Sequence, residues 1–415
     1  MKNNFQKVLF LVFFMTFSTA CKEANVVQPN FMIKVSQIKL HAPETGAPEV
    51  VNSFLYNSKL QKIFFSVMPT NTKGKTIFSF PFKESDPENL KTYLESFNVE
   101  SFSVGPQRQI QSSRDGTYMV FVGWNGNVHI FKNGQNYFNS KFQFDISSVA
   151  FGGGLLALGD EKGQIYFFNL AKKKLFDPKR IIDGEIASIA WFKKTQFIVA
   201  GNGDLFFVMD GATGETIRSV KLNKSLDDVL AVSGIQHCFE NRVNKVLYVA
   251  KQNLVLTSQG GDYCAQQKVK IWKADTWELV HTIKEIKFQV HQMSLGFNNN
   301  EALLIDYDEN LWRFDLNKFR LSKPLHLPKS IYFFDNHDLL AKMQASKIPF
   351  GKVNSISLIP NTNILVMALG SFFKAGPGLL MSRLNEDSIQ HMTFSEYYRG
   401  DLNLYVAAKE MVSKN

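Results

Sequence analysis

The stretch 109–132, QIQSSRDGTYMVFVGWNGNVHIFK, contains the local pattern on which the fold of this chain depends. Three short runs of β-forming residues are separated by Asp115-Gly116 and Asn125-Gly126, pairs that are typical of tight turns between antiparallel strands. The same order of strands and turns returns along the chain. Clear copies cover 151–170, 186–214, 246–276 and 293–316, and weaker copies cover 62–83 and 353–384. We therefore expect an all-β array of repeated hairpin units.

The composition supports a single large folded body. At about 150 residues per domain, the length of 415 residues allows two to three domains, or one large repeat domain. Hydrophobic residues make up 45% and charged residues 20%, which excludes a mainly disordered chain. Only three cysteines occur, which excludes a disulfide-dense scaffold. Because the repeats fill most of the length, we expect one ring of units, with the 38 phenylalanines packed between them.

Each copy ends its third strand on an aromatic or large apolar residue. These landmarks are Phe78, Phe131, Phe168, Met209, Trp272, Phe314 and Met381. Seven landmarks predict seven units of four strands each. Such a unit is too small to bury both of its faces, so the units stack. Closing the stack into a ring protects the terminal edges, and the segment 31–40, FMIKVSQIKL, is expected to add the outer strand of the last unit.

Two further segments carry a resemblance to a known class of repeat. The segment 269–276, VKIWKADT, followed by 279–283, LVHTI, resembles the end of a blade in WD40 repeats, and 159–169, GDEKGQIYFFN, is similar. Three of the six intervals between landmarks are close to the ~40–45 residues of a WD40 blade. No Gly-His pair opens the blades and no Trp-Asp dipeptide occurs, so the resemblance is to the broad WD40/YVTN-like class. It implies an all-β, seven-bladed β-propeller over residues 31–393.

The turn 209–215, MDGATGE, resembles the Asp-x-x-Thr-Gly turn of quinoprotein-like propellers. In such a turn the side chains of Asp210 and Thr213 are expected to cap the tight backbone. A quinone enzyme of this class would repeat a tryptophan-docking motif around the ring, whereas here the element occurs clearly once and without its closing tryptophan. The turn is therefore expected to be structural, and no cofactor is predicted.

The N-terminus has the form of an export signal. Lys2 and Lys7 precede the apolar run VLFLVFF at 8–14, and small residues follow at 18–20. A basic head, a short apolar centre and small residues before a cleavage point are typical of a secretory signal peptide. The apolar run is too short for a spanning helix, which needs about 20 residues. We expect residues 1–20 to be removed on export.

The four residues STAC at 18–21 resemble the lipobox of bacterial lipoproteins, in which the cysteine becomes the lipidated first residue of the mature chain. Ser18 occupies the place where the usual pattern has leucine. The resemblance implies a lipid anchor on Cys21, a tether over 21–30, and a place in the bacterial cell envelope. Lys22 after the cysteine favours the outer membrane, facing the periplasm or the cell surface. The alternative is an ordinary signal peptide cut near Ala20, with Cys21 uninvolved.

Two other groups of residues are candidates for a specific role. Outside the cytoplasm, Cys238 and Cys264 are expected to form a disulfide within the fifth unit, and the alternative is a pair of buried thiols. Phe372, Phe373 and Lys374, in the turn GSFFKAGPG, form an aromatic and basic tip that would contact a protein partner or the membrane. The alternative for this tip is packing under a neighbouring loop.

The sequence contains no recognisable catalytic or metal-binding pattern. The run DYDEN at 306–310 begins like a calcium loop, but Leu311 occupies the position that needs glycine, so a hairpin turn is expected. The histidines lack paired spacing, and no nucleophile elbow or phosphate-binding loop occurs. We predict no catalytic residue and no metal site. The formal net charge of +10 is spread thinly, and an exported protein rarely meets nucleic acid, so no nucleic-acid partner is predicted.

These observations favour a lipid-anchored, extracytoplasmic propeller that binds another envelope protein or acts as a scaffold, rather than an enzyme. The alternatives are a quinoprotein-like or lactonase-like enzyme with its site at the central channel, and a factor in outer-membrane protein assembly. The propeller would be followed by a tail at 394–415, with a short helix expected around 402–412.

Overall fold

The computed structural model describes residues 32–38, 50–68, 77–81, 100–102, 107–123, 126–222, 242–260, 268–296, 299–307, 310–326, 352–358, 364–370, 378–383 and 402–407. All the regular elements in these ranges, β1 to β31, are strands. They form seven sheets, which we number as blades 1 to 7 in chain order. In blades 1 to 6, the first four strands pair in chain order as antiparallel neighbours.

The first three blades follow one another directly along the chain. Blade 1 contains β2 (Val50–Asn57), β3 (Lys62–Met68), β4 (Ile77–Pro81) and β5 (Glu100–Phe102). Blade 2 contains β6 (Gln107–Ser112), β7 (Tyr118–Gly123), β8 (Asn127–Lys132) and β9 (Gln135–Lys141). Blade 3 contains β10 (Ile146–Gly152), β11 (Leu155–Asp160), β12 (Gln164–Asn169) and β13 (Lys174–Leu175), and β14 (Lys179–Arg180) also pairs with β12.

The next three blades repeat the arrangement. Blade 4 contains β15 (Ser188–Trp191), β16 (Gln196–Ala200), β17 (Leu205–Asp210) and β18 (Glu215–Lys221). Blade 5 contains β19 (Val243–Val249), β20 (Leu254–Gln259), β21 (Lys268–Lys273) and β22 (Leu279–Ile283). Blade 6 contains β23 (Val290–Leu295), β24 (Glu301–Asp306), β25 (Asn310–Asp315) and β26 (Arg320–Leu321), and β27 (Leu325–His326) also pairs with β25.

Blade 7 combines strands from both ends of the chain. Its order is β28 (Lys352–Leu358), β29 (Ile364–Gly370), β30 (Gly378–Arg383), β31 (Leu402–Ala407) and β1 (Met32–Ile38). β31 runs parallel to β30 and antiparallel to β1. The strand expected at 31–40 is thus present at the outer edge of this sheet.

The tail differs from its prediction. A helix was expected around 402–412, but the residues Leu402–Ala407 form strand β31, so the last sheet extends beyond residue 393. The sequence LNLYVA alternates apolar and polar residues at its start and contains good β-formers, and the open edge of β30 supplies backbone hydrogen-bonding partners.

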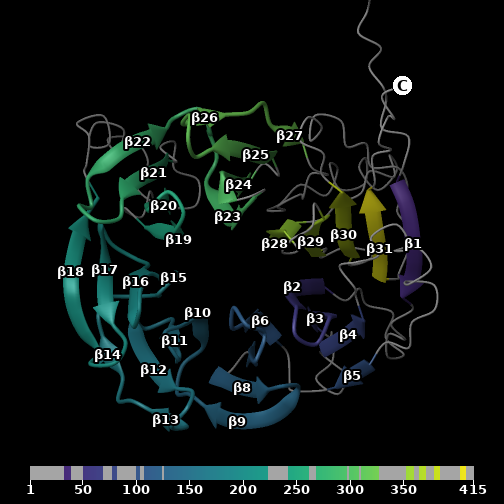
Figure 1. Cartoon of the computed structure of the whole chain (residues 1–415), viewed down its shortest axis with the longest axis horizontal. Coiled ribbons are helices and arrows are strands. Elements are labelled where there is room, and N and C mark those ends of the chain that lie inside the picture. Colours follow the sequence, from purple (N-terminus) through teal and green to yellow (C-terminus); the bar gives the residue numbers. More distant parts are fainter. Residues whose placement is uncertain are drawn as a thin grey trace, which may run out of the picture.

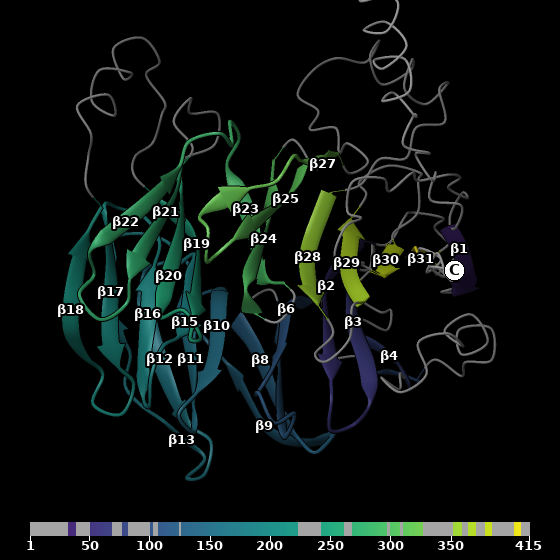
Figure 2. The ribbon, with the colours of Figure 1, turned by 45° about the horizontal axis from the view of Figure 1, so that its top comes forward.

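The blades form a closed ring around a common axis (Figure 1). The first strand of each blade lies against that of the next, from β2 through β6, β10, β15, β19 and β23 to β28. β2 in turn contacts β28 and β29, which closes the circle. Figure 2 shows the blades standing side by side around the ring. This arrangement is a β-propeller, and each of the seven landmark residues lies in the third strand of its blade.

The hydrophobic core lies in layers between neighbouring blades. Val120 and Ile130 of blade 2, for example, pack in one cluster with Leu156 and Phe168 of blade 3. Corresponding clusters join blades 1 and 2, 3 and 4, 4 and 5, and 5 and 6. Full burial of one such side chain contributes about 1.5–3 kcal/mol. The expectation that phenylalanines pack between units is confirmed among the described residues, where the following are almost fully buried: Phe65, Phe121, Phe168, Phe197, Phe206 and Phe314.

Two turns match the interpretation given to them. Asp210 Oδ1 accepts hydrogen bonds from the backbone N–H groups of Ala212 (2.7 Å) and Thr213 (3.4 Å), and Thr213 Oγ1 accepts one from Glu215 N–H (3.2 Å). Gly214 follows with φ +69°, where a side chain would be strained. The run 306–310 joins β24 to β25 as a hairpin, and the carboxylate of Asp306 accepts bonds from the backbone and side chain of Asn310.

Candidate functional site

The site residues expected from the sequence lie outside the described residues. These are Cys21 of the lipid anchor, Cys238 and Cys264 of the disulfide, and the tip residues Phe372, Phe373 and Lys374. The anchor, the disulfide and the tip therefore stay predictions. In the ranges that the structure does describe, no helix has the length and apolar character needed to cross a membrane. Over the same ranges, no three or more His, Cys, Asp or Glu side chains gather as ligands for a metal ion.

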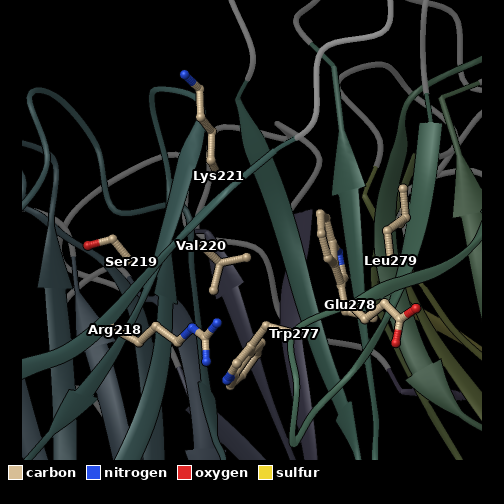
Figure 3. A pocket seen from close by; sticks show the side chains of 8 residues that line it. Arg218, Ser219, Val220, Lys221, Trp277, Glu278 and Leu279 are labelled. Carbon is tan, nitrogen blue, oxygen red and sulfur yellow. The ribbon is translucent and has the colours of Figure 1, made fainter.

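A pocket of about 490 Å³ lies at the outer rim of the propeller, between blade 4 and blade 5. We call it the rim pocket (Figure 3). One side comes from the outer strand β18, and the other comes from β21, β22 and the turn that joins them. Its lining residues are Arg218, Ser219, Val220, Lys221, Trp272, Trp277, Glu278 and Leu279.

Strand β18 supplies both a buried and an exposed surface to this site. The residues 215–219 are exposed, whereas Val220 is buried against the core between blades 4 and 5. Arg218 pairs with Val208 and Thr216 pairs with Met209, so Ile217 is the extra residue of a β-bulge. Such a bulge locally disrupts the strand and re-aims its side chains. Ile217 is 51% exposed and precedes Arg218, which lines the pocket.

Strand β22 of blade 5 also contains a β-bulge. Trp272 pairs with Leu279 and Ile271 pairs with His281, so Val280 is the extra residue here. Val280 is 40% exposed. Two neighbouring blade edges therefore each present an exposed β-branched side chain from a bulge, and the chain neighbours of these residues, Arg218 and Leu279, line the rim pocket.

The wall at Trp277 comes from the turn between β21 and β22. The N–H of Trp277 donates to the carbonyl of Lys273 at 2.7 Å, which closes the turn and holds Trp277 at φ +62°. This left-handed conformation is uncommon for a large residue and is tolerated only where the surroundings fix it. The indole ring packs on Phe192 and Phe206 of blade 4, with ring centroids 5.3 and 5.6 Å apart. Trp277 thus spans the joint between the two blades.

A salt bridge ties the same turn to blade 4. Lys193 Nζ lies 2.9 Å from Asp275 Oδ1, and the side-chain amide of Asn253 also donates to Asp275. The hydrogen bond from Lys193 is the main reason that the pKa of Asp275 lies below its ordinary value. Because this pair is exposed, its contribution is positional: it holds the turn over blade 4.

Trp272 provides the inner wall. Its side chain is 2% exposed, and its Nε1–H donates to Thr257 Oγ1 at 2.9 Å. The ring also makes an edge contact with Phe206 at 5.6 Å. A buried indole with its polar atom satisfied is rigid, so the inner wall is formed before any ligand arrives.

The charges around the rim pocket are asymmetric. Figure 3 shows the side chain of Arg218 extending toward Trp277, whereas Lys221 and Glu278 point away from the space between these two residues. Arg218 is exposed and makes no ion pair within the part of the chain that the structure describes. The pocket therefore combines the apolar side chains of Val220, Leu279 and the two tryptophans with one inward guanidinium, an arrangement suited to binding rather than to proton transfer.

Sequence reasoning missed this pocket. Trp272 was identified only as a strand landmark, and no role was predicted for 216–221. The pocket forms from residues more than fifty positions apart, in two blades, and a strand pattern reports on one blade at a time. The one local signal was a large aromatic residue, Trp277, within a turn.

Comparisons with solved structures identify the class of propeller. The chain is similar to a chain in the crystal structure of the mitotic checkpoint complex, with a TM-score of 0.55 and 16% identity over 83% of this chain and 90% of that one. It is also similar to the structure of U3-55K, with a TM-score of 0.54 and 11% identity over 78% and 89%. No protein-family model and no curated protein matches the sequence. The fold is a WD40-like β-propeller.

Proposed function

We propose that this chain is a membrane-anchored, extracytoplasmic propeller that binds another protein of the cell envelope. The observation that carries the proposal is the rim pocket, where Trp277 stands beside an inward arginine and the two blade edges expose Ile217 and Val280 next to lining residues. Protein interfaces are enriched in aromatic residues and arginine, which make up much of their binding energy. The similarity to a chain of the mitotic checkpoint complex is compatible with a role in assembly, although fold alone does not determine function.

The membrane anchor rests on the sequence alone. The apolar run at 8–14, the small residues at 18–20 and Cys21 support export followed by lipidation. Lipidation at Cys21 would hold the propeller at the bilayer through the tether 21–30, in the outer membrane and facing the periplasm or the cell surface. Cys21→Ala is expected to release the protein from the membrane fraction, whereas Cys264→Ala is not. Membrane retention of Cys21→Ala would contradict the lipid anchor.

Site-specific photo-crosslinking in cells tests the binding role. A photoreactive amino acid at Ile217 or Val280 is expected to capture the same partner protein from both positions. The control position is Asn136, an exposed residue of the outer strand β9 in blade 2, where this adduct should be absent. Identical adducts from all three positions, or no adduct from the first two, would overturn the proposal.

The described part of the chain gives no specific support to a quinoprotein-like enzyme. The Asp210 and Thr213 side chains are engaged within their own turn, as expected for a structural element. A role in outer-membrane protein assembly is a special case of binding an envelope protein, and the identity of the crosslinked partner would distinguish it.

A further inference from the structure

We infer that the rim pocket binds an extended segment of a partner protein in which an apolar side chain stands next to a carboxylate. The inference rests on the proposed function only in assigning this segment to another protein. It is more specific than that function, because it names the chemistry by which this surface would select its partner.

The apolar half of the recognition comes from the walls. Trp277, Leu279 and Val220 face a space of about 490 Å³, which lies within the ~300–1,000 Å³ range of ligand pockets in proteins. The walls are also fixed in advance. Trp272 is buried and hydrogen-bonded, and the Lys193–Asp275 pair anchors the turn that carries Trp277. A preformed apolar pocket lowers the cost of ordering on binding, so it can hold one large side chain of a flexible segment.

Recognition of the partner's carboxylate comes from Arg218. Its side chain extends toward Trp277, and no carboxylate within the described ranges neutralises it. A guanidinium presents paired N–H donors that match the two oxygens of a carboxylate. Lys221 lies on the same edge and adds positive charge, while Glu278 points away from Arg218 (Figure 3). Phosphorylated segments are usually held by clusters of arginines, so a single inward guanidinium favours a carboxylate.

The geometry of β18 explains why side chains, rather than backbone, would make the contact. β18 is the outer strand of blade 4, so its free edge could in principle accept another strand. The bulge at Ile217 interrupts the regular spacing of hydrogen-bonding groups on that edge. Continuous strand addition is therefore disfavoured over 216–218, and a passing segment is recognised through Ile217, Arg218 and the pocket behind them.

Selection from a display library of random linear peptides tests this inference on the folded mature protein. The expected peptides carry Asp or Glu next to a large apolar residue. Selection on Arg218→Glu is expected to replace the acidic preference by Lys or Arg, since the charge of the site is reversed. Arg320→Glu is the matched control because it reverses an exposed arginine on the outer strand of blade 6, and it should return the same peptides as the wild type.

The affinity of the best acidic peptide gives a second readout. Arg218→Glu should weaken binding by about tenfold or more, and replacing the acidic residue of the peptide by its amide should have a similar effect, because each removes a charge-assisted hydrogen bond. Arg320→Glu should leave the affinity unchanged. Failure to enrich any peptide, enrichment without acidic residues, or equal losses in the two arginine variants would each overturn the inference.

The crosslinking experiment distinguishes failure of the carboxylate recognition from failure of the proposed binding function. A partner captured at Ile217 whose capture persists in Arg218→Glu would uphold the proposed function and overturn the carboxylate recognition. Acidic peptides that depend on Arg218, combined with no protein captured at Ile217 or Val280 in cells, would uphold the recognition chemistry and overturn the proposed function.

Discussion

At the scale of single residues, buried aspartates organise the hairpins between the second and third strands. Asp306 is fully buried, and its carboxylate accepts bonds from the backbone and side-chain nitrogens of Asn310 and from Trp312 Nε1 at 2.8 Å. Asp160 is also fully buried and accepts from the N–H groups of Lys162 and Gln164. A buried carboxylate is tolerated only when it is hydrogen-bonded in this way, so each aspartate fixes its turn.

Asp306→Ala is therefore expected to lower the free energy of unfolding by about 3 kcal/mol, because it leaves several buried donors without an acceptor. Asp115→Ala is the matched control. Asp115 binds Ser113 and Thr117 in the hairpin between β6 and β7 of blade 2, but these contacts are exposed, and about 1 kcal/mol or less should be lost. Urea unfolding followed by tryptophan fluorescence measures both. Equal losses would contradict the role assigned to Asp306.

Tyr166 gives one hairpin a dependence on alkaline pH. Its single hydroxyl proton is shared between two acceptors, Asp160 Oδ2 at 3.2 Å and Gln164 Oε1 at 2.9 Å. Burial, reinforced by the Asp160 carboxylate, raises the pKa of Tyr166 from 10.0 to about 12. The folded state thus holds this proton more tightly than the unfolded chain does. The resulting stabilisation is complete below pH 10 and is lost as the pH rises from 10 toward 12.

Comparison of the wild type with Tyr166→Phe tests this. At neutral pH the variant should be less stable, by about 1 kcal/mol for the hydrogen bond lost. The difference should shrink between pH 10 and pH 12, because only the wild type has this proton to lose. Urea unfolding at a series of pH values measures the difference. A gap that stays constant across this window would show that Tyr166 does not titrate in the folded protein as expected.

At the scale of elements, the turn between the third and fourth strands works as a clamp between blades. In blades 3 to 6, this turn places one residue in the left-handed region, with φ +51° at Lys173, +69° at Gly214, +62° at Trp277 and +51° at Phe319. Three of these residues reach back to the preceding blade. Lys173 Nζ lies 4.2 Å from the Tyr137 ring centroid, Trp277 packs on Phe206, and Phe319 lies 5.5 Å from the ring centroid of His281.

If Trp277 is held in the left-handed conformation, the glycine variant at this position should be more stable than the alanine variant, the reverse of the usual order. Both substitutions remove the packing on blade 4 and should cost several kcal/mol. Glycine also relieves the left-handed strain, which costs an alanine about 1 kcal/mol, so Trp277→Gly should be more stable than Trp277→Ala by about that amount. Thermal unfolding of the two variants gives the comparison. If alanine proves equal or better, the turn does not hold residue 277 in the left-handed conformation.

The elements show which features a single sequence can predict. Strand ends were predictable, because Phe131 or Trp272 closes an apolar run followed by turn residues, and the cap at Asp210 follows from side-chain chemistry. The rim pocket could not be predicted from the sequence, because it depends on how Arg218 and Trp277 come together from two different blades. The prediction of a helix in the tail was wrong for a related reason. The residues Leu402–Ala407 become a strand because the edge of β30 is available, which is a property of the assembled sheet.

At the scale of the whole molecule, the ring is joined at blade 7, where the two ends of the chain meet. β31 lies between β30 and β1, so it connects the last hairpin to the strand that precedes blade 1 (Figure 1). In a ring each blade is supported from both sides, and the loss of one joint leaves two faces open. The stability of the propeller therefore depends on a strand near the C-terminus.

Deletion of residues 402–415 removes β31, and with it the backbone pairing of β1 and the outer edge of β30. At about 1 kcal/mol for each backbone hydrogen bond lost, we expect a drop of more than about 3 kcal/mol in the free energy of unfolding. We also expect aggregation through the newly open edge. Deletion of 408–415 is the control, since it leaves β31 complete. Thermal unfolding and light scattering compare the two proteins. If both deletions leave the midpoint and the solubility unchanged, the stability of blade 7 does not depend on β31.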